Sequence, residues 1–66
     1  MNKNKKVAAK YYKLAADRDN TFSMRCYAFM LYEGDGIEEN KEEAARYFKP
    51  AEDKGDTESI LFRNAF

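Results

Sequence analysis

The sequence has 66 residues, so it holds at most one small domain, and a chain of this size hides only about 60% of its unfolded surface on folding. Its twelve basic and twelve acidic residues cancel, which argues against nucleic acid or an acidic membrane as a partner of the whole chain. It contains no His and a single Cys, which excludes a disulfide framework and a Cys/His zinc site within one chain.

The charges are nevertheless separated along the chain. Residues 1–32 contain seven basic and two acidic residues, a net charge of plus five, and residues 33–66 contain five basic and ten acidic residues, a net charge of minus five. This separation favours attraction between opposite ends of two copies, although charged helix faces that are simply solvated give the same pattern.

No apolar run has the length of a secretory signal or a membrane span. Lys10 and Lys13 interrupt the only candidate, residues 7–16. The lone thiol suits a reducing compartment. We therefore expect a cytoplasmic chain with no membrane partner.

A 36-residue internal repeat organises the sequence. Sliding the chain by 36 positions places residues 8–13 (AAKYYK) on residues 44–49 (AARYFK), and ten of the 29 aligned positions are identical. Ordinary residue usage would give about two identities by chance. A repeat of this length is typical of a solenoid, and the chain holds about one and three-quarter copies of it.

The first predicted helix covers residues near 4–18, and lysines and Asp17 occupy its polar side. Its apolar residues recur at helical spacing and are expected to face the core: Val7, Ala8, Tyr11, Leu14 and Ala15. Asp19 follows at the position where the second copy has Gly55. Because Asp tolerates the left-handed conformation better than most residues, a turn is expected there in both copies.

The second predicted helix, residues 21–33, is apolar nearly all round. One stripe contains Met24, Tyr27, Ala28 and Leu31, and most of a second contains Phe22, Cys26, Phe29 and Tyr32. This pattern indicates a helix that lies between two one-sided helices, with Cys26 as a buried structural thiol. Residues 34–36 (GDG) are expected to end the helix, since Gly readily adopts the left-handed conformation.

The third predicted helix, residues 41–54, begins with Asn40 and Glu43 in the spacing of a capping box. Its expected inward residues are Ala44, Tyr47, Phe48 and Ala51. Pro50 interrupts the pattern, so the helix is expected either to kink or to stop near Phe48. A fourth helix is predicted at residues 57–66.

These motifs resemble the Sel-1-like repeats, relatives of the tetratricopeptide repeats. The resemblance rests on AAKYYKLA at residues 8–15, AARYFKPA at residues 44–51, GDGI at residues 34–37 and the repeat of 36. It covers about residues 4–66 and implies an all-α, right-handed solenoid fragment that forms one module over residues 1–66. It also implies a non-catalytic scaffold or adaptor that binds other proteins. The single Cys26 does not match the cysteine-stapled extracellular members.

Candidate chemistry elsewhere in the chain is weak. Residues 31–42 can be aligned with a calcium-binding EF-hand loop, but Leu31 and Glu38 then occupy positions where a ligand and an apolar residue are needed. Cys26 has no His to act as its base, and the acids at residues 38–43 are expected to favour a helix start. We therefore expect no catalytic residue, no metal and no cofactor.

The candidate partner-binding residues are Arg25, Phe29 and Tyr32. In related solenoids the first helix of each unit lines the concave surface, and aromatic and Arg side chains are the usual anchors of interfaces. Packing of these residues against a neighbouring helix is the alternative. For the chain as a whole, the alternative is a regulatory or targeting segment of a larger enzyme, such as a repeat-fused kinase. The open ends of the repeat array also predict self-association.

Overall fold

The computed structural model describes residues 2–64, and the side chains of residues 5–61. This part of the chain forms four helices and no strand. They are α1 (Asn2–Asp17), α2 (Thr21–Glu33), α3 (Lys41–Asp53) and α4 (Thr57–Asn64). The four predicted helices and the all-α solenoid class are confirmed, while the predicted extension of the last helix to residues 65–66 lies outside the described residues.

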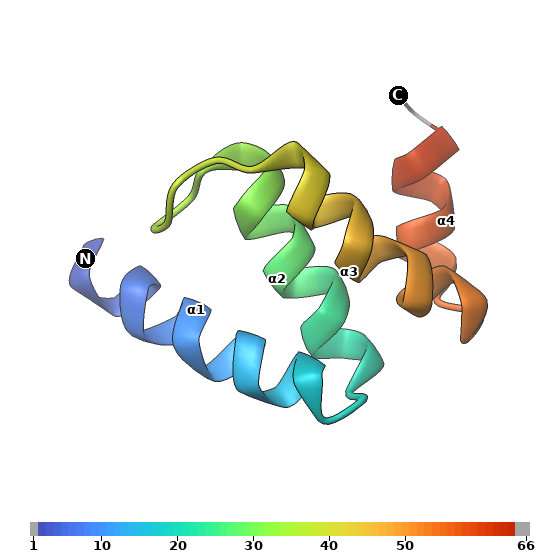
Figure 1. Cartoon of the computed structure of the whole chain (residues 1–66), viewed down its shortest axis with the longest axis horizontal. Coiled ribbons are helices and arrows are strands. Elements are labelled where there is room, and N and C mark those ends of the chain that lie inside the picture. Colours follow the sequence, from blue (N-terminus) through green and yellow to red (C-terminus); the bar gives the residue numbers. More distant parts are fainter. Residues whose placement is uncertain (1, 65–66) are drawn as a thin grey trace.

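The helices lie side by side in chain order, with α2 between α1 and α3 (Figure 1). α4 packs mainly against α3 at the far side of the array, so α1 and α4 are at opposite ends (Figure 1). This order explains the nearly all-round apolar sequence of α2, since it contacts a neighbour on two sides. The predicted sandwiched helix is confirmed.

The core forms where α2 meets its two neighbours. Its main cluster combines Tyr27, Ala28 and Leu31 of α2 with alanines and aromatic side chains of α1 and α3. A second cluster joins Ala16 of α1, Met24 of α2 and an alanine of α3. Small alanine side chains let the helices approach closely, and the larger α2 side chains fill the remaining space.

The prediction that the large apolar residues of α1 face the core is wrong. Val7, Tyr11 and Leu14 are 51%, 68% and 60% exposed, whereas α1 turns Ala9 and Ala16 into the core. An apolar stripe identifies a face that is suited to packing, but it does not say which neighbour that face meets. In α1 the stripe lies away from α2, on the outer side of the array.

The turns of the two copies match closely. Asp19 has a φ of +75° and Gly55 a φ of +85°, so both adopt the left-handed conformation that the sequence predicts. The next residues, Asn20 and Asp56, accept hydrogen bonds from the backbone N–H groups of Ser23 and Ser59 at 3.0 and 3.1 Å. The same cap therefore begins α2 and α4.

At the start of α3 one expectation needs correction, and at Pro50 one of the two open alternatives is excluded. The Asn40 side chain accepts from the Glu43 N–H at 3.0 Å, but its own N–H donates to the Leu31 carbonyl at 2.8 Å, so only half of the capping box forms. Helix α3 also does not stop near Phe48, because it continues through Pro50 to Asp53. Burial of Phe48 and Ala51 holds the last turn in place despite the missing proline N–H.

Candidate protein-interaction surface

The least buried side of α2 forms a continuous stripe, which we call the α2 outer stripe. Its members recur three or four positions apart on one helix face: Phe22, Arg25, Cys26, Phe29 and Tyr32. The intervening residues of α2 are buried against α1 and α3. The three predicted partner-binding residues therefore share one face, opposite the packed side of the helix.

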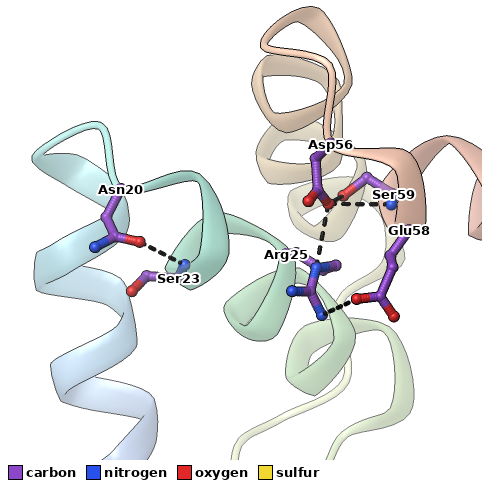
Figure 2. Close-up of polar contacts among 6 residues, drawn as sticks. All are labelled: Asn20, Ser23, Arg25, Asp56, Glu58 and Ser59. Atoms are coloured by element: carbon purple, nitrogen blue, oxygen red, sulfur yellow. Dashed lines mark hydrogen bonds and ion pairs between the residues drawn. The ribbon is translucent and has the colours of Figure 1, made fainter.

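Arg25 anchors one end of this stripe to the following repeat. Its Nε lies 3.2 Å from Asp56 Oδ2, and its Nη1 lies 3.2 Å from Glu58 Oε2 (Figure 2). The Arg25 and Asp56 side chains are each only 16% exposed, so this ion pair is less screened than a surface pair. The buried Nε has no partner in hydrogen-bond geometry. Arg25 thus has a packing role between repeats, which was the alternative expectation for it.

Asp56 interacts with both α4 and α2. One of its oxygens accepts from the backbone N–H of Ser59 at 3.1 Å and from the Ser59 hydroxyl at 2.6 Å, and it also faces Arg25 (Figure 2). The cap of α4 is therefore tied electrostatically to α2. Asn20, the matching cap of α2, is neutral and binds Ser23 alone in this view (Figure 2).

Phe22 is the most open member of the stripe, with 55% of its surface exposed. The Arg25 guanidinium carbon lies 5.0 Å from its ring centroid, and the Tyr12 ring of α1 meets it edge-on at 6.3 Å. These contacts fix the ring without covering it. Sequence reasoning placed Phe22 on the right stripe but did not select it as a binding residue, although its spacing from Arg25 and Phe29 gave that signal.

Phe29 and Tyr32 continue the stripe toward the glycine loop, and both are half-buried. The Phe29 ring meets Phe48 of α3 edge-on at 5.3 Å, and the Lys41 ammonium lies 5.0 Å from the Tyr32 ring centroid. Both side chains therefore pack within the chain and also keep part of their surface on the outer face. The structure brings the three predicted residues together as a partly solvent-exposed aromatic and cationic strip.

Cys26 lies within the stripe and is half-buried rather than fully buried as expected. Burial raises the pKa of its thiol, and the nearby Arg25 lowers that pKa by a smaller amount. A thiol with a raised pKa is mostly protonated at neutral pH, which disfavours nucleophilic chemistry.

The remaining candidate positions do not converge on a chemical site. Leu31 of the EF-hand alignment is in the core, and Asp35 forms an ion pair with Lys5 at 2.8 Å. No group of three or more metal-ligating side chains occurs within the described residues. In the same part of the chain, no helix has the length and apolar character needed to cross a bilayer.

Comparison with known proteins identifies the repeat. The Sel1 repeat family matches the chain at residues 1–20 and again at residues 23–56. None of the curated proteins and none of the solved structures matches it significantly. The second matched segment begins within α2 and ends after α3, so α2 and α3 are the two helices of one repeat.

Proposed function

Because the chain belongs to the Sel1 repeat family, whose repeats are generally protein-interaction modules, we propose that it is a non-catalytic scaffold or adaptor module of the cytoplasm. Its partners are other proteins, including further copies of the chain, rather than nucleic acid or membrane. The α2 outer stripe is the proposed binding surface, with Arg25, Phe29 and Tyr32 as contact residues.

The observation that supports this proposal is the form of the α2 outer stripe. Aromatic rings along one helix face are fixed by contacts with α1 and α3, and Phe22 remains 55% exposed. Rigid aromatic side chains contribute contact area at a low cost in conformational entropy, which is why they dominate interface hot spots. Arg25 is already paired with Asp56 and Glu58, so the strip is best suited to a protein segment with apolar anchor residues.

A selection from a peptide library displayed on phage tests the proposal. Peptides enriched on the intact chain would be measured by fluorescence anisotropy against Tyr32→Ala, with Arg46→Ala as the control. The Arg46 side chain is 79% exposed on α3, outside the stripe. We expect Tyr32→Ala to weaken binding at least about tenfold, the range of an interface hot spot, and Arg46→Ala to leave it unchanged. Equal binding by both variants and the wild type would contradict the proposed surface.

A further inference from the structure

The exposed large apolar residues among the described side chains gather on two parts of the array. Val7, Tyr11 and Leu14 lie on α1, Phe22 lies at the start of α2, and Leu61 lies on α4. Because α1 and α4 are at opposite ends (Figure 1), the exposed residues of α1 and Leu61 of α4 cannot cover one another within a single copy. Exposed apolar side chains grouped on a surface are typical of an interaction site.

The internal repeat indicates which helix would pack against the exposed face of α1, which contains Val7, Tyr11 and Leu14. A shift of 36 residues places Tyr11 of α1 on Tyr47 of α3. Tyr47 is half-buried, and its ring meets Tyr27 of α2 edge-on with the centroids 4.9 Å apart. The α1 face therefore repeats the face with which α3 binds the first helix of its own repeat.

We propose that this face binds α4 of a second copy, so that α4 of one copy and α1 of the next pack as α2 and α3 do within the chain. α4 is the helix that repeats α2. Ser59 matches Ser23 under the shift of 36, both serines are buried, and both receive the same cap. Because α4 matches α2 and α1 matches α3 under this shift, the alignment of α4 against α1 of the next copy is determined. Each contact within the chain then predicts an equivalent contact between copies.

The first predicted contact is a hydrogen bond. Within the chain, the Tyr47 hydroxyl of α3 donates to Asp17 of α1 at 2.9 Å. A shift of one repeat moves this pair to Tyr11 of the second copy and Asp53 of the first. Both residues are exposed in the single copy, so the donor and the acceptor are available.

The second predicted contact is apolar, and it is the strongest support for the proposal. Within the chain, Arg25 of α2 pairs with Glu58 of α4. The same shift moves this pair to Leu61 of one copy and Phe22 of the next, which are 62% and 55% exposed. Within the chain the contact therefore joins two charged residues, and between copies the equivalent contact joins two exposed apolar residues. Both positions of the pair change from charged to apolar, so the two sides of the contact remain complementary.

The charge distribution supports the same orientation. Residues 1–32, which contain α1 and all of α2 except Glu33, carry a net charge of plus five, and residues 33–66, which contain α3 and α4, carry minus five. Stacking head to tail brings these halves together, whereas a two-fold dimer through α1 would oppose two basic faces. A head-to-tail contact leaves one free end of each kind, so assembly continues beyond a dimer.

This inference deepens the proposed interaction function by naming a second copy as the partner. Contact between copies uses the α1 and α4 faces and only Phe22 of the α2 outer stripe, whereas the peptide test is read at Tyr32, near the other end of that stripe. Failure of self-association would therefore leave the peptide result intact, and the reverse also holds.

Sedimentation velocity on the 66-residue chain tests the contact by complementation. Leu14→Glu blocks the α1 face and Leu61→Glu blocks the α4 face, so each variant alone should remain monomeric where the wild type forms species larger than a dimer. An equimolar mixture should form one-to-one dimers and nothing larger, because each variant retains the face that the other has lost. Arg46→Glu adds negative charge at a side chain that is 79% exposed on α3, outside both faces, and is the control that should not abolish association.

The outcomes separate the possible occupants of the α1 face. A wild type that stays monomeric at all concentrations overturns the proposal. So does loss of association in Leu14→Glu alone, which would indicate a two-fold contact between α1 helices. A mixture of the two variants, each shown by circular dichroism to be folded, that stays monomeric also overturns it. High salt should weaken association, since the two halves attract through opposite charges.

Two milder variants keep the test valid if a glutamate substitution unfolds the chain. Tyr11→Phe and Asp53→Ala each remove one group of the predicted hydrogen bond and should weaken association roughly two- to tenfold. The double variant should be no weaker than either single variant, because both changes remove the same bond. Additive effects, or no effect of either change, would show that the register is wrong.

Discussion

At the scale of single residues, Gly36 is where the glycine loop touches α1. Its φ is +84°, and a Cβ there would lie 2.7 Å from Lys5 Cβ and 3.1 Å from the Lys5 backbone carbon. Gly55 has a similar φ of +85°, but a Cβ there would meet nothing within 4 Å. A substitution at Gly55 therefore tests backbone strain alone, whereas a substitution at Gly36 tests backbone strain together with steric contact.

We expect Gly55→Ala to lower the free energy of unfolding by about 1 kcal/mol, because an L-residue is strained at positive φ. Gly36→Ala should cost at least about 1 kcal/mol more, because it also pushes the loop away from α1. Urea denaturation followed by circular dichroism measures both values. Equal losses would contradict the close approach of the loop to Lys5.

Residues with a local backbone role were predictable from sequence. Asp19 and Gly55 adopt the left-handed conformation, and Asn40 caps α3, because these roles depend on nearby residues. The pairing of Arg25 with Asp56 and Glu58 was not predictable in the same way. It depends on how α4 docks beside α2, which local sequence does not determine.

At the scale of helices, sequence periodicity predicted the number and order of elements better than their faces. The sandwiched position of α2 was predictable because this helix is apolar on two sides. The predicted buried face of α1 was wrong, because Val7, Tyr11 and Leu14 form a stronger apolar stripe than the alanines that meet α2. Repeat helices have two packing faces, and periodicity alone does not rank them. Of the two alternatives at Pro50, a kink or a stop near Phe48, the stop is excluded because α3 continues to Asp53, and tertiary packing there outweighs one missing hydrogen bond.

The hydrogen bond from Tyr47 to Asp17 links α3 to α1 across α2. Burial first, and then this bond to a carboxylate, raise the pKa of Tyr47 from 10.0 to about 12. Because the pKa is higher in the folded state, the stabilisation is complete below pH 10 and is lost as the pH rises through about 12.

Thermal melting across this range should therefore show the melting temperature falling above pH 10, with a smaller fall in Tyr47→Phe. Burial also raises the pKa of Tyr27, so part of the fall should remain in that variant. Identical profiles for Tyr47→Phe and the wild type would show that the phenol does not contribute.

At the scale of the whole molecule, stability follows the order of the array. α2 packs against both α1 and α3, whereas α1 packs mainly against α2, and α4 mainly against α3. In repeat proteins stability is approximately a sum of repeat and nearest-neighbour terms. The helix with two extensive neighbours should therefore open least often, and the helices at the ends should open most often.

Hydrogen exchange measured by mass spectrometry tests this gradient. In dilute solution, amides in α2 should exchange at least about tenfold more slowly than amides in α4, a difference of roughly 1.4 kcal/mol in opening free energy. Raising the protein concentration should slow exchange most in α1 and α4, because head-to-tail stacking supplies each with a second neighbour. Gly36→Ala should speed exchange in α1 more than in α4, since its contact is with Lys5. Uniform exchange in all four helices would mean that the chain opens as one cooperative unit, and an unchanged pattern on concentration would argue against stacking through its ends.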